Sequence, residues 1–141
     1  MLDNQLIKMQ RIPIMSRLKS YRHLPAFVLV LLAKEDLYGA AILNKMKLDM
    51  PFFFDTDLSL IYRLLQDLES IGAIAHYWDT AKPGPARKWY KLTKIGFDEL
   101  TNYKKDIEKR MENFVFFMNV YENTKNKFIG SPSETNTDIK K

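Results

Sequence analysis

The sequence predicts a mainly α-helical fold with one small β-hairpin, and three features in succession support this prediction. Residues 58–71 repeat apolar side chains at helical spacing, and Gly72 follows them as a typical helix-ending residue. Two short runs rich in aromatic residues come next, at 73–78 and 87–93, and a loop rich in proline and glycine joins them. The second run is strongly basic. A helix, a hairpin and a basic second strand in this order are the plan of a winged helix-turn-helix.

Length and composition allow one domain and an appendage. The chain has 141 residues, of which 46% are hydrophobic, as in globular proteins. It contains no cysteine, which excludes disulfides and cysteine nucleophiles and fits the cytoplasmic location that we expect. The two histidines lack the spacing of metal ligands, and no phosphate-binding loop occurs, so we expect no metal, no cofactor and no enzymatic activity. The apolar run 24–33 is too short to span a membrane.

The net charge of +5 favours a polyanionic partner, and the charge is unevenly distributed. Positive side chains gather in residues 1–23 and in the hairpin with its exit, residues 82–94. Residues 55–70, in contrast, carry four carboxylates against one arginine. The two ends of the predicted domain are therefore basic and its middle is not.

The segment before the helix at 58–71 predicts three further helices. Residues 14–22 can form a short one, and Pro25 suits the first turn of a second, which is apolar nearly all round and should lie in the middle of the fold. Asp36 is placed to cap a third helix, which ends before Pro51. Residues 52–54 fit either a short strand or a loop anchored in the core, and we favour the loop.

The helix at 58–71 is predicted to have one buried and one open face. Asp55, Thr56 or Asp57 can supply its N-cap. The apolar positions at helical spacing are Leu58, Ile61, Leu64 or Leu65, Leu68 and Ile71, and the opposite face carries Ser59, Tyr62, Arg63, Gln66 and Glu69.

The C-terminal part predicts one long helix from residue 94 to about 127, because it contains no proline and a single glycine. Its apolar residues recur at alternating steps of three and four, which suits packing against a helix of a partner chain. We divide the chain into an N-terminal arm (1–13), a winged helix-turn-helix (14–95), a dimerisation helix (96–128) and a disordered tail (129–141). The residues expected at the dimer interface are Leu100, Ile107, Met111, Phe114 and Met118.

Several short motifs stand in a fixed order along the middle of the chain. They are Leu37-Tyr38-Gly39, Ile61-Tyr62, Leu64-Leu65, Leu68-Glu69, Gly72, the run Lys88-Trp89-Tyr90-Lys91-Leu92-Thr93, and Gly96. Over roughly residues 24–100 the chain thereby resembles the PadR family of bacterial transcriptional regulators. The resemblance implies a winged helix-turn-helix, a dimer formed through the C-terminal helix and binding to palindromic operator DNA.

Two departures from the family pattern stand out. The family usually has Gly-Thr before the Leu-Tyr pair of its third helix, where this chain has Ser59-Leu60 before Ile61-Tyr62. Drug-sensing members carry a tryptophan on the dimer helix, and Ile107 occupies the matching position here. The resemblance therefore disfavours stacking of planar drugs, although a small-molecule effector of another kind stays open.

The helix at 58–71, which corresponds to the third helix of the family, is the element expected to enter the major groove, where base edges can be distinguished. Arg63 and Gln66 suit guanine and adenine, and Ser59 and Tyr62 suit phosphates. Tyr38 is placed for a phosphate at a helix N-terminus, and Lys82, Arg87 and Lys88 of the hairpin suit the DNA backbone or minor groove. The competing interpretation is that these side chains cover a solvated face and that Tyr38 and Tyr62 pack in the fold. We expect Trp78 and Trp89 to pack within the hairpin rather than to stack on a ligand.

These features predict a homodimeric, sequence-specific DNA-binding regulator, a repressor that reads an inverted repeat in double-stranded DNA. One alternative is a winged-helix protein-interaction module, suggested by the acidic residues 55–69 and the missing Gly-Thr. Another is a structural DNA binder of a plasmid or phage, which binds without controlling a promoter.

Overall fold

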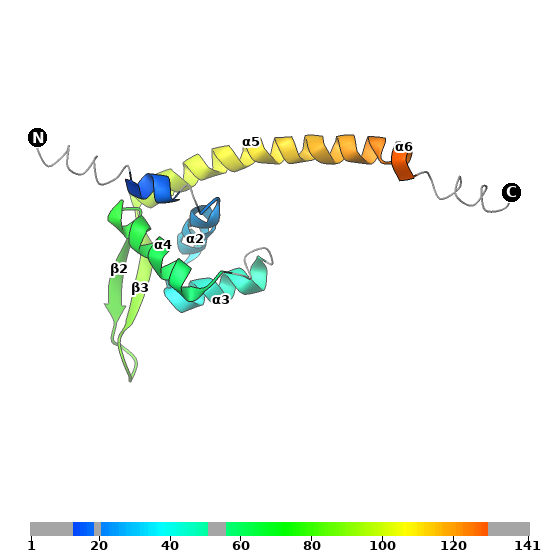
Figure 1. Cartoon of the computed structure of the whole chain (residues 1–141). Coiled ribbons are helices and arrows are strands. Elements are labelled where there is room, and N and C mark those ends of the chain that lie inside the picture. The colour runs from blue at the N-terminus through cyan, green and yellow to red at the C-terminus, as the bar shows by residue number, and fades with distance from the viewer. Residues whose placement is uncertain (1–12, 19–20, 51–55, 130–141) are drawn as a thin grey trace, which may run out of the picture. The chain divides into compact units, whose positions relative to one another are not determined.

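The computed structural model describes residues 13–18, 21–50 and 56–129. Residues 13–18 are helical, and seven further elements lead to a short terminal helix, α6 (Figure 1). The mainly helical architecture with a small sheet and a long C-terminal helix agrees with the prediction. The elements are α2 (Leu24–Lys34), β1 (Leu37–Tyr38), α3 (Gly39–Asp49), α4 (Leu58–Ser70), β2 (Ile74–Asp79), β3 (Arg87–Leu92), α5 (Lys94–Thr124) and α6 (Asn126–Ile129).

The core lies within the unit that extends to Tyr103 and is built around α2, α3, α4 and the sheet. Helix α2 has Pro25 in its first turn and buries residues on most of its circumference, as its apolar sequence predicts. Helix α4 buries one stripe and exposes the other, because its apolar residues recur every three or four positions. The fully buried side chains of α4 are Ile61, Leu64, Leu65 and Leu68.

The sheet has three antiparallel strands in the order β1-β3-β2. The predicted hairpin forms β2 and β3, paired from Ile74 opposite Leu92 to Asp79 opposite Arg87. The third strand, β1, was not predicted: Leu37 and Tyr38 pair with Tyr90 and Trp89 of β3. A strand of two residues has no periodicity of its own, and its pairing lies some fifty positions away in the sequence.

The start of α3 corrects the prediction that Asp36 caps it. The N-cap is Tyr38, without a side-chain hydrogen bond, because β1 intervenes between Asp36 and the helix. The Asp36 carboxylate instead accepts a hydrogen bond from the Tyr77 hydroxyl of β2 at 2.8 Å. Asp36 therefore joins the β1 segment to the hairpin.

The two ends of α4 follow the predicted signals. Among the three N-cap candidates, Asp57 has the role in the structure: its Oδ1 accepts a hydrogen bond from the Leu60 N–H at 2.7 Å. At the other end Gly72 has φ +80°, the left-handed conformation that glycine adopts most easily. The predictions for residues 52–54 and for residues 130–141 of the tail lie outside the described residues, whereas Ile129, which we counted with the disordered tail, is the last residue of helix α6 (Asn126–Ile129).

Helix α5 begins directly after the hairpin and ends at Thr124, so one long helix forms as predicted, with α6 as a short continuation. Its first turn is held by Thr93, whose Oγ1 accepts a hydrogen bond from the Gly96 N–H at 3.1 Å and donates to the carbonyl of Ala73 at 2.9 Å. The part of α5 from Lys104 onward belongs, with α6, to a second unit. Within the described part of the chain, no helix combines the length and apolar character needed to cross a membrane.

Candidate nucleic-acid interface

The exposed stripe of α4 gathers the four side chains predicted to face DNA. Ser59, Tyr62, Arg63 and Gln66 are all exposed, at positions three and four apart that share one helix face. The buried side of the helix packs into the core, so this stripe is fixed in direction by the packing. The structure thus brings these four residues together on one surface.

Tyr62 also contacts the N-terminus of α3. A Cβ added at Gly39 would lie 2.5 Å from the Tyr62 Cε1 atom, so the ring of Tyr62 rests on the glycine backbone. Tyr62 nevertheless stays 48% exposed. It both packs against α3 and presents its edge to solvent, which combines the two interpretations of the sequence. A side chain at position 39 would therefore collide with the Tyr62 ring unless the ring moved.

The two cations predicted on strand β3 lie on opposite faces of the hairpin. Residues that pair across antiparallel strands share a face, and neighbours along a strand alternate. Lys88 pairs with Trp78, and its Nζ lies 5.5 Å from the centre of the Tyr90 ring. Arg87 lies over the Tyr38 ring on the other face, at 4.5 Å. Arg87 and Lys88 therefore project from opposite faces of the hairpin.

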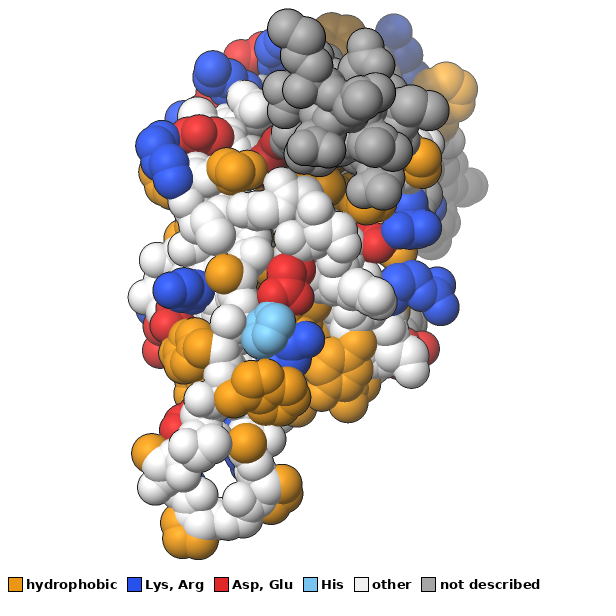
Figure 2. All heavy atoms as spheres, turned by 90° about the vertical axis from the view of Figure 1, so that its left-hand side faces the viewer, with side chains coloured by type: hydrophobic (Ala, Val, Ile, Leu, Met, Phe, Trp, Pro, Cys, Tyr) orange, Lys and Arg blue, Asp and Glu red, His pale blue; other side chains and the backbone are white. Residues whose placement is uncertain are grey.

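The Lys88 face of the hairpin is connected to α4. The His76 Nδ1 of β2 contacts the Glu69 carboxylate of α4, and the His76 ring meets Trp78 edge to face with centroids 6.3 Å apart. Trp78 was predicted to pack within the hairpin, but it is 58% exposed. Figure 2 shows this side of the domain, where hydrophobic side chains gather between the body and the projecting hairpin loop.

The opposite face of the hairpin holds Tyr38. It is half-buried in β1, and its ring meets Trp89 edge to face with centroids 5.2 Å apart. Trp89 is half-buried here, which agrees with its predicted packing role. Arg87 covers the Tyr38 ring, so the pair of Tyr38 and Arg87 forms a joint surface rather than two separate contacts. Lys82 lies apart from both, exposed in the loop between β2 and β3.

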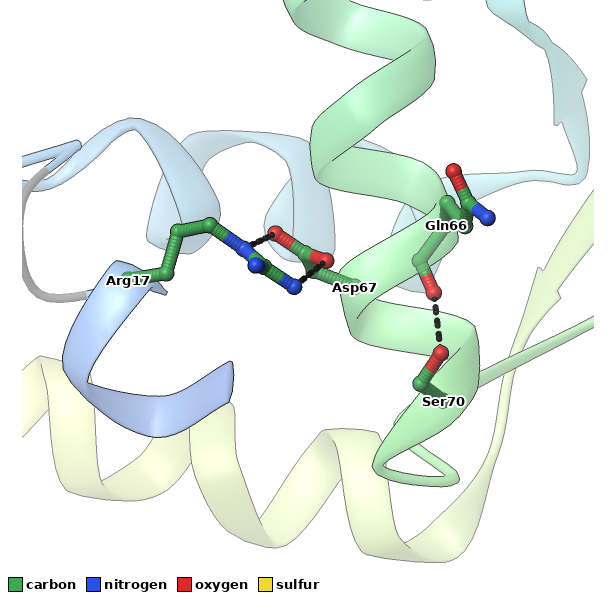
Figure 3. A network of polar contacts seen from close by, with 4 residues as sticks. All are labelled: Arg17, Gln66, Asp67 and Ser70. Carbon is green, nitrogen blue, oxygen red and sulfur yellow. Dashed lines mark hydrogen bonds and ion pairs between the residues drawn. The ribbon is translucent and has the colours of Figure 1, made fainter. Parts of the chain in front are cut away.

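The carboxylates of α4 are turned away from its exposed stripe or are paired. Asp67 is only 4% exposed and binds Arg17 through two hydrogen bonds (Figure 3). Glu69 is half-buried and meets His76. Sequence reasoning missed Arg17, because fifty residues separate it from Asp67 and no local pattern links them. The hydrogen bond and charge of Asp67 raise the pKa of the Arg17 guanidinium.

The residues predicted for the dimer interface fall into two groups. Leu100 packs partly against the core of its own chain. Met111, Phe114 and Met118 are each more than half exposed, and Ile107 is partly exposed. These four lie in the unit that begins at Lys104. No group of three acidic or histidine side chains within the described ranges could hold a metal ion.

Known proteins share this arrangement of a winged helix-turn-helix domain with helix α4 exposed on its surface. The model of the transcriptional regulator PadR-like family matches residues 28–102, more than half of the chain. The chain belongs to this family. It is accordingly a DNA-binding transcriptional regulator and not an enzyme. No curated protein matches this PadR-like chain at a significant level.

Solved structures similar to the PadR-like chain include three regulators. A PadR family regulator from Clostridium difficile R20291 is 28% identical, with a TM-score of 0.57 over 66% of this chain and 98% of that one. A PadR-like transcription factor from Bacteroides fragilis is 25% identical, with a TM-score of 0.59 over 74% and 98%. Bacillus subtilis PadR in complex with operator DNA is 30% identical, with a TM-score of 0.53 over 58% of this chain and 46% of that one.

Tyr90 gives the PadR-like domain a predictable response to alkaline pH. Burial raises the pKa of the Tyr90 phenol, and nearby Lys88 opposes this with a smaller effect. In the unfolded chain the phenol ionises at about pH 10, so the stability it contributes is complete below that pH and is lost as the pH rises through the higher folded-state pKa. We expect Tyr90→Phe to reduce the loss of Tm above about pH 10. Thermal melts at neutral and alkaline pH measure this, and equal losses in both proteins would contradict it.

Proposed function

We propose that the protein is a homodimeric repressor that reads an inverted-repeat operator in double-stranded DNA. The observation that carries the proposal is the exposed stripe of α4, which presents Ser59, Tyr62, Arg63 and Gln66 in a chain of the PadR-like family. An α-helix fits the major groove, where arginine and glutamine can read guanine and adenine. The Bacillus subtilis PadR structure, solved with operator DNA, supports the same use of this fold here. Such a regulator acts in the cytoplasm.

The hairpin supports the proposal by supplying cations next to α4. Lys88 and Arg87 lie on its two faces and Lys82 is exposed in its loop, so the hairpin can approach phosphates from either side. Phosphate contacts fix the position of the protein on the duplex without reading sequence. In this proposal Tyr38 acts with Arg87 at the backbone, and Tyr62 and Ser59 act at phosphates beside the bases that Arg63 and Gln66 read.

Homodimerisation is proposed from the exposed apolar surface of α5. Met111, Phe114 and Met118 repeat at helical spacing and are more than half exposed. Contiguous exposed apolar surface of this kind is typical of protein interfaces. A second copy, packed through the same stripe together with Leu100 and Ile107, would bury it and pair two recognition helices about 34 Å apart, one turn of DNA. If a small-molecule effector exists, it would act by changing this spacing through the dimer interface.

The alternative of a protein-interaction module is weakened by the arrangement of the acidic residues. Its main support was the negative charge of residues 55–69. In the structure Asp57 caps α4, Asp67 is buried against Arg17 and Glu69 meets His76. These three carboxylates are therefore engaged within the domain, and the exposed stripe of α4 carries Arg63 as its charged side chain.

A selection from randomised DNA tests the proposal. The full chain is presented with a duplex library about three helical turns long, and bound sequences are recovered, sequenced and titrated. We expect an inverted repeat with half-sites one turn apart, or a multiple of it, bound by one dimer with a Kd of about 10 nM or tighter at physiological salt. Failure to enrich any sequence, or a monomer on the selected duplex in sedimentation equilibrium, would overturn it.

A further inference from the structure

We propose that the helical segment of residues 13–18 positions the recognition helix for DNA through the contact between Arg17 and Asp67. This inference rests on the proposed function, because it assigns a role to a residue outside the DNA-facing surface. Arg17 is a positioning residue in this proposal: it touches α4 and not the bases.

The contact has the geometry of a specific, two-point interaction. The Arg17 Nε donates to Asp67 Oδ2 at 2.8 Å, and the second guanidinium nitrogen donates to Oδ1 at 2.6 Å, so both carboxylate oxygens are used (Figure 3). A paired arrangement of this kind fixes orientation as well as distance, which a single point charge does not. Figure 3 shows Arg17 reaching from its own helix across to the side of α4.

Asp67 requires this partner because of where it lies. It is only 4% exposed and sits among the buried leucines of α4, namely Leu64, Leu65 and Leu68. A carboxylate in such a place is unfavourable unless it is paired and hydrogen-bonded. Arg17 satisfies both oxygens. The buried face of α4 is therefore complete only when residues 13–18 are in place.

The segment that carries Arg17 is itself anchored in the core. Leu18, the next residue, is 2% exposed, and Ile14 and Met15 pack partly against the same cluster. All four residues precede the part of the chain that matches the PadR-like family model, which begins at residue 28. This chain thus adds an anchored helical segment to the matched domain and bonds it to the helix that is to read DNA.

The position of Asp67 connects the contact to sequence reading. Asp67 follows directly after Gln66 and lies one turn after Arg63, and a helix turns about 100° per residue. The bond between Arg17 and Asp67 therefore fixes the rotation of α4 about its axis. That rotation sets the direction in which the exposed side chains of Gln66 and Arg63 point. A rotation of α4 about its axis would move both side chains away from the base edges that they are to meet.

The test compares affinity for the selected duplex with affinity for a scrambled duplex of the same composition. Arg17→Gln removes the paired geometry and leaves Asp67 unsatisfied, and Arg17→Leu with Asp67→Leu replaces the pair by an apolar contact that keeps the domain stable. At a temperature where each protein is folded by circular dichroism, we expect both variants to lose about tenfold in discrimination, the size of one lost base contact. Affinity for the scrambled duplex should stay within about twofold, because phosphate contacts are kept.

Arg110→Gln is the matched control, since Arg110 also pairs with an aspartate, Asp106, at 2.9 Å on the exposed surface of α5. It should leave discrimination unchanged. If the double leucine variant discriminates as well as the wild type, Arg17 only stabilises the fold and the inference is overturned. Failure of the wild type to select any sequence would instead overturn the proposed function, so the two failures are distinguishable.

Discussion

Replacing Gly96 by alanine is expected to lower the free energy of unfolding by about 3 kcal/mol, the upper part of the usual range for overpacking a filled site. A Cβ at Gly96 would lie 2.0 Å from the Ala73 carbonyl oxygen and 2.7 Å from the Leu92 Cδ1 atom. Leucine side chains can move, but this backbone carbonyl is held in place: it accepts hydrogen bonds from the Thr93 N–H at 3.1 Å and from the Thr93 Oγ1 at 2.9 Å. Urea denaturation measures the loss.

Asn102→Ala serves as the control for this prediction. Asn102 is an exposed residue further along α5, and an exposed substitution of this kind usually changes stability by less than about 0.5 kcal/mol. A Gly96→Ala variant that unfolds at the same urea concentration as Asn102→Ala would mean that the corner between β3 and α5 can open without cost. The junction would then not fix the start of α5, contrary to the geometry around Thr93.

Local signals in the sequence account for the parts of the fold that were predicted correctly. The 3.6-residue repeat of α4, its N-cap at Asp57 and its end at Gly72 all depend on residues within a few positions of each other. The hairpin is also local, because a short loop rich in proline and glycine joins two β-prone runs. These elements follow from short-range backbone preferences, and the packing reinforces them.

Contacts between distant segments account for what was missed. Strand β1 forms because Leu37 and Tyr38 pair with the edge of β3. Because of this pairing, α3 begins after Tyr38 and not after Asp36. The bond between Arg17 and Asp67 likewise joins segments fifty positions apart. A single sequence carries no signal for either pairing, since each arises only when the core brings the segments together.

In the candidate site, too, some features follow from local sequence signals and others depend on contacts between distant segments. The helical repeat was sufficient to place Ser59, Tyr62, Arg63 and Gln66 on one face, because their direction follows from the buried stripe. The hairpin cations were found as a group, but their distribution over two faces depends on the strand register. Lys88 pairs opposite Trp78, whereas Arg87 pairs opposite Asp79 and lies over Tyr38.

Replacing Arg63 and Gln66 together by alanine is expected to reduce discrimination between the selected duplex and a scrambled one by about 100-fold. Each bidentate contact to a base is worth roughly 1–3 kcal/mol of discrimination, and two lost contacts of about 1.4 kcal/mol each give this factor. Both side chains are exposed on α4, so the substitution leaves no cavity and should change Tm little. Fluorescence anisotropy titrations with the two duplexes at one salt concentration measure the ratio.

Lys82→Ala is the contrasting variant, because a cation at a phosphate carries no sequence information. It should weaken binding to both duplexes by the same factor and reduce the slope of log affinity against log salt by about 1. The two variants thus separate recognition of the base sequence from electrostatic binding to phosphates. If the Arg63 and Gln66 variant also weakened both duplexes equally, α4 would contribute only charge and contact area, and sequence would have to be read by the hairpin. If it left both affinities unchanged, α4 would not face DNA at all, and its exposed stripe would be a solvated surface.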